Sequence, residues 1–141
     1  MKKRYFATII LGVCMMFSLF GCGNHFQVLD GDGMVYKPHY VQISQDEAKL
    51  MMKDDDGHVI VDVRRPDEYE KGHIPGAILI PNESITDTPP EALPDKYQVI
   101  LIYCRTGRRS KEAAEKLAKM GYVNVYEFGG IEEWTGEVVT E

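Results

Sequence analysis

The sequence lacks the paired cysteines, the clustered histidines and the excess of basic residues that several functional classes require. Of its three cysteines only Cys104 lies beyond position 22, so a disulfide within the main part of the chain is excluded. His25, His39 and His58 do not have the spacing of metal ligands, and no metal site is predicted. Lysine and arginine number 16 against 22 acidic residues, a net charge of −6, which disfavours nucleic acid as a partner.

A hydrophobic run long enough to span a bilayer is also missing. Residues 5–20 carry no charge, but these 16 positions are fewer than the ~20 that a spanning helix needs. Because three basic residues precede it at positions 2–4, the segment is typical of a signal peptide. It ends at positions 19–22 in Leu-Phe-Gly-Cys, which resembles the lipobox of bacterial lipoproteins. An uncleaved signal anchor with an incidental cysteine is the alternative.

The lipobox resemblance implies that residues 1–21 are removed and that Cys22 becomes a lipid-bearing N-terminus. A diacylglycerol and an N-linked acyl chain such as palmitate would hold the protein firmly, because each buried CH2 contributes ~0.8 kcal/mol. We therefore expect a lipid anchor at the extracytoplasmic face of the cell membrane. Residues 22–38, rich in Gly, Asp and Asn, are predicted to be a tether, and residues 39–141 the folded domain. Without the basic residues at positions 2–4, 13 basic residues face 22 acidic ones, a net charge of −9.

From position 40 onward the hydrophobic pattern alternates between strands and helices. Short apolar runs predict strands, and periodic runs with capping signals predict helices. This alternation over about 100 residues predicts an α/β domain built on an open sheet. The predicted strands are 41–43, 58–63, 77–80, 98–103 and 124–128, and the predicted helices are 44–53, 66–70, 110–120 and 129–134. Residues 88–95 are predicted to form a proline-rich loop with room for one helical turn.

The segment directly after the strand 98–103 carries the reactive pattern. Residues 104–110 read Cys-Arg-Thr-Gly-Arg-Arg-Ser, with a helix predicted to begin at Ser110. Ligands of open α/β sheets bind beyond the carboxyl ends of the strands, where helix N-termini present free amides. Such a position favours the thiolate of a cysteine over its thiol, and Gly107 allows successive amides to turn toward the sulfur. Together with Lys111, three arginines place four of the 13 remaining basic residues within seven positions.

Each of these loop residues can also have a purely structural role. A free cysteine at a strand end is commonly a small buried apolar residue, and the arginines outweigh that interpretation only as a group. One arginine, Arg108 before the others, can simply be a solvated helix residue with an i,i+4 partner. The candidate substrate-binding residues are therefore the whole loop, namely Arg105, Thr106, Gly107, Arg108 and Arg109.

Three segments in order resemble the rhodanese-like family. Residues 104–110 look like the active-site loop of single-domain rhodaneses. Residues 59–77, from Val-Ile-Val-Asp-Val-Arg to Gly-His-Ile-Pro-Gly-Ala, resemble the N-terminal signature of that family. Residues 128–134, Phe-Gly-Gly-Ile-Glu-Glu-Trp, resemble its C-terminal signature. The match spans about residues 40–136.

This resemblance implies a five-stranded, mostly parallel sheet with helices on both faces, and a sulfurtransferase reaction without a metal or organic cofactor. Cys104 would take a sulfur atom from thiosulfate or a related anionic donor and pass it to cyanide or a thiol. Arg105 and Arg109 would hold the sulfonate of the donor, while the loop amides cradle the persulfide. Asp62 and Arg64 would support the loops, and His73 would fix a turn rather than act as a base.

Three other functions remain open. A cysteine phosphatase or arsenate reductase uses a similar loop, but its usual pattern places arginine six positions after the cysteine, where this chain has Ser110. A membrane-tethered sulfur carrier or redox partner would need an external protein thiol, because Cys104 has no resolving cysteine. The third is a catalytically inactive interaction module. A monomer is the default expectation for all of them.

Overall fold

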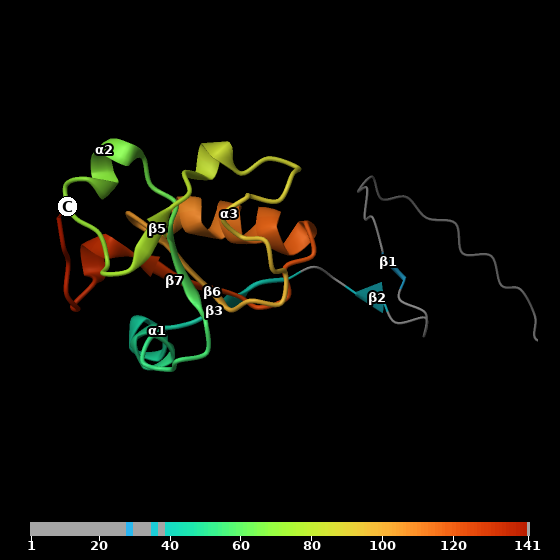
Figure 1. Ribbon diagram of the computed structural model, residues 1–141, viewed down its shortest axis with the longest axis horizontal. Coiled ribbons are helices and arrows are strands. Elements are labelled where there is room, and N and C mark those ends of the chain that lie inside the picture. Colours follow the sequence, from blue (N-terminus) through green and yellow to red (C-terminus); the bar gives the residue numbers. More distant parts are fainter. Residues whose placement is uncertain (1–27, 30–34, 37–38, 141) are drawn as a thin grey trace, which may run out of the picture.

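A five-stranded parallel sheet forms the centre of the domain (Figure 1). The structure, a computed structural model, describes residues 28–29, 35–36 and 39–140. The strands run in the order β3-β7-β6-β4-β5, and all four pairings between neighbours are parallel. Their bounds are β3 Val41–Gln42, β4 Val59–Asp62, β5 Ala77–Leu79, β6 Ile100–Cys104 and β7 Val125–Gly130. The predicted open α/β sheet is confirmed.

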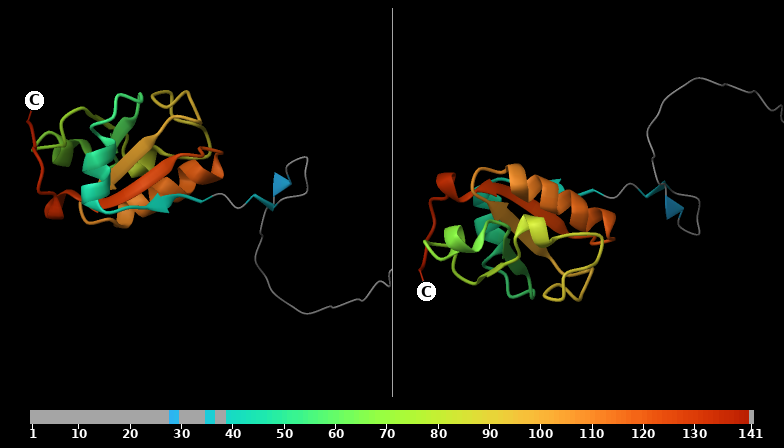
Figure 2. Two further views of the ribbon diagram at one scale, coloured as in Figure 1. Left: turned by 90° about the horizontal axis from the view of Figure 1, so that it is seen from below. Right: turned by 90° about the horizontal axis from the view of Figure 1, so that it is seen from above.

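Helices cover both faces of the sheet, as Figures 1 and 2 show for α1 on one side and α3 on the other. The side chain of Ser44 accepts from the amide of Glu47, and Glu47 accepts from the amide of Ser44, so the predicted capping box starts α1. The helices are α1 Gln45–Met51, α2 Pro66–Tyr69 and α3 Arg108–Lys119, with 3₁₀ turns η1 Asn82–Ser84 and η2 Ile131–Glu133.

The period-two alternation along the central strand divides the interior into two cores. In β6, Ile100 and Ile102 pack toward α3, while Leu101 and Tyr103 pack toward α1. All five residues of β6 are buried, as expected for a parallel strand covered on both faces. This packing fixes the register of β6, and therefore the place where the chain leaves the sheet at Cys104.

The boundaries around Cys104 differ from the sequence prediction. Cys104 is the last residue of β6 instead of the first residue of a loop, and α3 begins at Arg108, two positions earlier than expected. The cause is Gly107, whose φ of +98° turns the chain directly into the helix without a side-chain cap. Within 88–95 a single turn forms, in which the amide of Leu93 donates to the carbonyl of Pro90 over 2.9 Å, and a separate 3₁₀ turn lies at Asn82–Ser84.

The segment predicted to be a tether contains a pair of short strands. β1 (Val28–Leu29) and β2 (Val35–Tyr36) pair antiparallel. The intervening sequence is rich in Asp and Gly, the residues favoured where a chain reverses between two strands. The predicted signal peptide and Cys22 lie outside the described residues. No helix in the described part of the chain has the length and hydropathy needed to cross a bilayer.

Candidate active site

The sulfur of Cys104 lies at the carboxyl edge of the sheet, below the N-terminus of α3. The amide of Gly107 donates a hydrogen bond to Sγ over 3.1 Å, and the hydroxyl oxygen of Ser110 lies 3.5 Å from Sγ. Cys104 is 1% exposed and belongs to the apolar core on the α3 side. The sulfur is buried against aliphatic side chains on one side, while a backbone amide faces it on the other.

Two glycines allow the loop to close tightly over the sulfur. The left-handed φ of Gly107 directs its amide toward Sγ, and a side chain at that position would be strained. Gly130 pairs with Cys104 across the sheet, where β7 shows a register shift. A Cβ atom on Gly130 would lie 2.6 Å from the Cα of Thr106 and would collide with the carbonyl of Arg105. Glycine at 130 therefore lets the end of β7 support the loop, a role that the sequence did not indicate.

Each of the three loop arginines has an acidic partner. Arg109 donates from both terminal nitrogens to the two carboxylate oxygens of Glu68, over 2.7 and 2.8 Å. This bond is the main reason that the pKa of Glu68 falls from 4.5 to about 2. The pKa of Arg109 is raised chiefly by the same bond, with a smaller contribution from the charge of Cys104.

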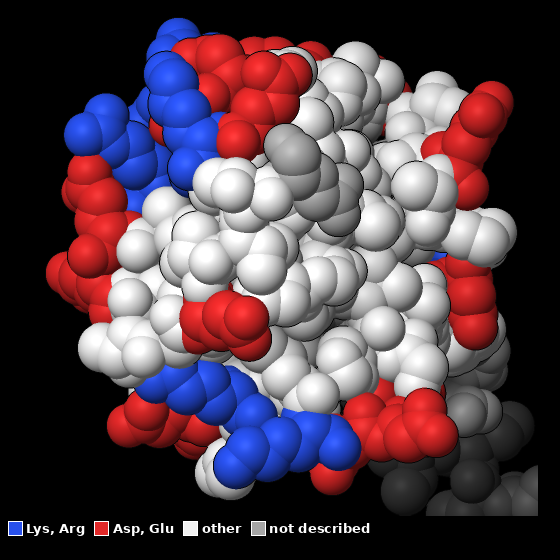
Figure 3. All heavy atoms as spheres, turned by 60° about the vertical axis from the view of Figure 1, so that its left-hand side comes forward, with Lys and Arg blue, Asp and Glu red and all other residues white. Residues whose placement is uncertain are grey.

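The other two arginines are more exposed and also paired. Arg105 Nε donates to Glu132 over 2.7 Å, and the carbonyl of Arg105 accepts from the amide of Glu132 over 3.2 Å. Arg108 pairs with Glu112 one helical turn later, over 2.6 Å, which is the i,i+4 arrangement predicted for it. Figure 3 shows the same mixture on one face of the molecule, where basic side chains lie directly against acidic ones.

A polar hollow of about 410 Å³ lies over the loop. Four arginines contribute to its wall, but three glutamates do so as well, so that the charges nearly balance. The residues that line it are Arg65, Glu68, Glu83, Arg105, Thr106, Arg108, Arg109 and Glu132. The structure therefore brings the predicted residues Arg105, Thr106, Arg108 and Arg109 to one hollow, and adds glutamates from distant parts of the sequence.

Asp62 and Arg64 form a buried pair beside the loop. The carboxylate of Asp62 accepts from Nε and Nη2 of Arg64 over 2.6 to 3.0 Å, and the same Nη2 donates to the carbonyl of Gly72 over 2.7 Å. Burial opposes the charge on Arg64, but the bond and charge of Asp62 outweigh it and raise the pKa of the guanidinium. Asp62 on β4 lies opposite Tyr103, the residue before Cys104 on β6. The Asp62–Arg64 pair therefore connects this part of the sheet to the turn after α2.

The predicted turn residue His73 is tied to its own segment. It is 2% exposed, its ring stacks on Tyr69 at 3.7 Å between centroids, and Nδ1 lies 3.0 Å from the carbonyl oxygen of Tyr69. Its backbone pairs with Val139 through two hydrogen bonds of 2.9 Å. These contacts bring the C-terminal segment against the turn after α2.

Glu127 is a site residue that the sequence analysis missed. It is 2% exposed on β7, and its carboxylate accepts from the hydroxyl of Ser110 over 2.6 Å. Ser110 in turn contacts the sulfur of Cys104. An acidic residue within the apolar strand Val125–Phe128 was the available signal, since a carboxylate in such a strand is buried only with hydrogen-bonding partners.

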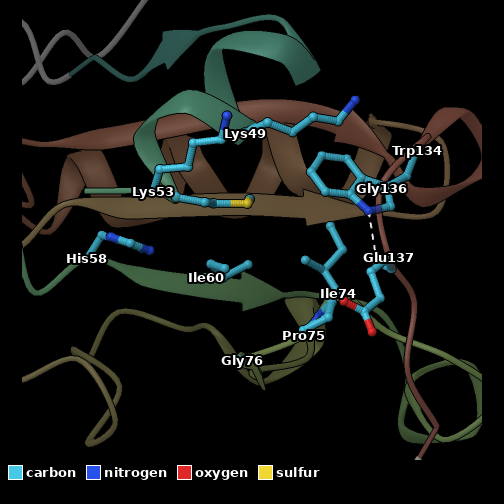
Figure 4. Close-up of a pocket in the computed structure, with 11 residues that line it drawn as sticks. Lys49, Lys53, His58, Ile60, Ile74, Pro75, Gly76, Trp134, Gly136 and Glu137 are labelled. Atoms are coloured by element: carbon cyan, nitrogen blue, oxygen red, sulfur yellow. Dashed lines mark hydrogen bonds between the residues drawn. The ribbon is translucent and has the colours of Figure 1, made fainter. Parts of the chain in front are cut away.

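A second hollow, of about 610 Å³, contains none of the loop residues. Figure 4 shows Lys49 and Lys53 on its α1 side, Ile60 on β4 and Trp134 near Glu137, to whose carbonyl the indole donates over 3.1 Å. Its lining mixes apolar, basic and acidic side chains and includes no cysteine. Within residues 39–140 we find no group of three His, Cys, Asp or Glu side chains that could hold a metal ion.

Comparisons with known proteins agree with this architecture. Residues 44–137 match the model of the rhodanese-like domain. Thiosulfate sulfurtransferase PspE of Escherichia coli is 40% identical over 73 residues, which cover 52% of this chain and 70% of the relative. The "Putative sulfur carrier protein YrkF" of Bacillus subtilis is 36% identical over 97 residues, covering 68% of this chain and 51% of the relative.

Solved structures give the same result. A rhodanese with anions from E. coli has a TM-score of 0.55 and 36% identity, covering 60% of this chain and 99% of that one. A rhodanese-like domain protein from Staphylococcus aureus has a TM-score of 0.62 and 32% identity, covering 72% and 98%. With the sheet order, the cysteine loop and these matches together, the chain belongs to the rhodanese-like family.

Proposed function

We propose that this protein is a sulfurtransferase that carries a sulfane sulfur on Cys104 between a donor and a thiophilic acceptor. The observation that supports it most directly is the hydrogen bond from the Gly107 amide to Sγ at the N-terminus of the 12-residue helix α3. An amide and the positive end of a helix both stabilise negative charge on sulfur. The same groups favour the anion of a persulfide attached at that position.

The reaction proceeds in two displacements. The Cys104 thiolate attacks the outer sulfur of thiosulfate, the S–S bond breaks with its electron pair on the leaving sulfite, and a persulfide anion remains on Cys104. A cyanide ion or an acceptor thiolate then attacks the outer sulfur, and the Cys104 thiolate leaves. Each step transfers one sulfur atom without a net change of charge, and neither step needs a metal or an organic cofactor.

The paired arginines bear on the choice of donor. Arg109 can reach a sulfonate at the hollow only by sharing its guanidinium with Glu68. Arg105 is similarly engaged by Glu132, although both groups are well exposed and the pair is therefore weak. These contacts favour modest affinity for thiosulfate, and they make an uncharged polysulfide or a protein persulfide a competitive donor.

A second candidate function is a membrane-tethered sulfur carrier that exchanges with another protein. The nearly balanced charges of the hollow favour it over rapid turnover of free anions. The relative named as a sulfur carrier supports the same idea. In this case a thiol protein would receive the sulfur from the Cys104 persulfide.

The two candidates separate in one set of assays on the purified protein. Thiosulfate with cyanide, an aryl phosphate, and arsenate with a reductant would be offered in turn. We expect turnover with thiosulfate alone, and none from the Cys104→Ser variant. A sulfur adduct on Cys104 with negligible cyanide turnover would favour the carrier. Phosphate release at a comparable rate would replace both with a phosphatase, and no adduct with any donor would indicate an inactive module.

We also propose that the domain acts at the extracytoplasmic face of the cell membrane through lipid on Cys22. The proposal is supported by the basic positions 2–4, the uncharged residues 5–20 and the lipobox-like positions 19–22. Expression with a labelled fatty acid should transfer label to the protein, and Cys22→Ser should abolish labelling. A wild-type protein that takes up no label and keeps residues 1–21 would support an uncleaved anchor instead.

A further inference from the structure

The buried carboxylate of Glu127 has contacts that the sulfur-transfer scheme does not use. Besides the 2.6 Å bond from Ser110, Oε1 accepts from the amide of Gly129 over 2.9 Å, and Oε2 accepts from Nε2 of Gln42 over 3.0 Å. These three hydrogen bonds satisfy a carboxylate that is 2% exposed, and none of the three donors is a cation.

Ser110 lies between this carboxylate and the sulfur. It is fully buried, and its oxygen is 2.6 Å from Glu127 Oε1 and 3.5 Å from Cys104 Sγ. A hydroxyl has one proton to donate, and the 2.6 Å contact assigns it to Glu127 in preference to the Gly107 carbonyl at 3.1 Å and the sulfur at 3.5 Å. Ser110 then presents only lone pairs to the sulfur. That arrangement suits a thiol, whose S–H can donate to the oxygen, and it is unfavourable for a thiolate.

We propose that Glu127 is a positioning residue that receives, through Ser110, the proton that Cys104 loses when its thiolate forms. The S–H proton passes to Ser110 Oγ while the Ser110 proton passes to Glu127 Oε1. The products are a thiolate, an intact hydroxyl that now donates to sulfur, and a neutral carboxylic acid. No net charge is created in the buried site. The proposal concerns the protonation of Cys104 before the donor transfers its sulfur. Its functional meaning rests on the proposed sulfurtransferase function.

Few other charged groups face Glu127. Tyr40, before β3, lies near it, because burial first, and then the charges of Glu127 and Glu115, raise the pKa of that phenol. Cys104 comes from β6. Helix α1 packs on the opposite side of β7, beside Tyr126 and Phe128. A thiolate and an ionised Glu127 together would repel one another in this low-dielectric setting, and moving the proton between them avoids that cost.

The test measures the rate at which iodoacetamide alkylates Cys104 in the full-length protein, with the site resolved by mass spectrometry, from pH 5 to 10. We expect two steps in the wild-type profile, because under this proposal one proton is shared between the sulfur and the carboxylate. Glu127→Gln keeps an oxygen for Ser110 and Gly129 but cannot accept a proton. It should reduce the profile to one step and slow alkylation at pH 7 about tenfold. This decrease is smaller than the rate enhancement that a positioned general base usually gives.

The opposite sign would overturn the proposal. If Glu127 is an ionised structural residue, its removal relieves repulsion of the thiolate, and alkylation at pH 7 becomes faster or stays unchanged. Ser110→Ala keeps the test decisive even if Glu127→Gln does not fold, because it cuts the link while leaving the carboxylate on Gly129 and Gln42. It should slow alkylation by a similar factor, and the two changes together should slow it no further.

A matched control is Glu91→Gln in an exposed loop, which should leave the profile unchanged. Alkylation needs no sulfur donor, so the test of the proton coupling is independent of the test of the sulfurtransferase function. A two-step profile in a protein without sulfur transfer would reject the function alone, and sulfur transfer with a one-step wild-type profile would reject the coupling alone.

Discussion

The two arginine–carboxylate pairs near Cys104, Arg64–Asp62 and Arg109–Glu68, are both bidentate. They differ in the sequence separation of the partners and in their exposure to solvent. Arg64 and Asp62 are two positions apart in sequence, and their side chains are 7% and 0% exposed. Arg109 and Glu68 are 41 positions apart, and each side chain is 14% exposed beside the polar hollow. The first pair is enclosed by protein, while the second lies where a small anion can compete.

The difference indicates that a bidentate ion pair can either fix the path of the chain or orient an arginine for binding an anion. A buried pair that also donates to a backbone carbonyl fixes the path of the chain, and breaking it leaves a charge without solvent or partner. A pair at the wall of a hollow keeps its arginine oriented but can exchange the carboxylate for another anion at little cost. We therefore expect changes at Asp62 to affect stability, and changes at Glu68 and Arg109 to affect the handling of the donor.

The largest effect is expected from Asp62→Asn. The Arg64 guanidinium would remain buried without its counter-charge, and removal of one partner from a buried pair costs about 3–5 kcal/mol. Urea denaturation followed by circular dichroism measures this free energy of unfolding. Glu115→Gln, which breaks the exposed pair with Lys119, is the control and should cost less than about 0.5 kcal/mol. Equal costs for the two variants would mean that water reaches Arg64.

The second effect is on the donor. Arg109→Ala should raise the KM for thiosulfate about tenfold, in line with the loss of one charge-assisted hydrogen bond. The KM for an uncharged polysulfide should change less than about twofold, because no sulfonate needs the guanidinium. Steady-state kinetics with both donors provides the measurement. If both KM values rise together, Arg109 shapes the loop and does not hold the anion.

The contrast between the two pairs also marks what could be predicted from sequence. Asp62 and Arg64 were expected to support loops, and Cys104 and Gly107 were placed at a strand–helix junction, because each of these features is local in the chain. The bonds from Arg109 to Glu68 and from Arg105 to Glu132 cross 41 and 27 positions, and no periodicity signals them. Only the Arg108–Glu112 contact, within one helix, has a local pattern.

Two errors of the sequence prediction, the start of α3 and the omission of Glu127, have physical causes. The start of α3 was expected at Ser110, whereas the left-handed Gly107 starts the helix at Arg108, and Ser110 is buried against the sulfur. Glu127 was passed over within an apolar strand, although a lone acid at such a position indicates a buried network. In both cases a residue that is ordinary at the surface has an interior role set by tertiary contacts.

A smaller effect is expected from Glu68→Gln, which removes the charge that competes for Arg109. The KM for thiosulfate should fall about threefold, the scale of a partly solvated ion pair. Because the pKa of Glu68 is lowered to about 2, the pair contributes stability that is fully present above the ordinary pKa of 4.5 and is lost as the pH falls toward 2. Thermal midpoints of the wild type and the variant should therefore differ at pH 6 and converge near pH 2. A difference that is constant over this range would mean that the ion pair is not its source.

The smallest effect is expected from Arg108→Ala, although Arg108 is the immediate neighbour of Arg109 in the same motif. Its side chain is 73% exposed and pairs with Glu112 along the surface of α3, so its loss should cost no more than about 0.5 kcal/mol and change the KM for thiosulfate less than about twofold. Kinetics at low and high salt tests the reason. A rise in KM equal to that of Arg109→Ala, seen only at low salt, would mean that the hollow attracts its donor through the summed field of all its arginines. Equality that persists at high salt would mean that both guanidinium groups contact the anion.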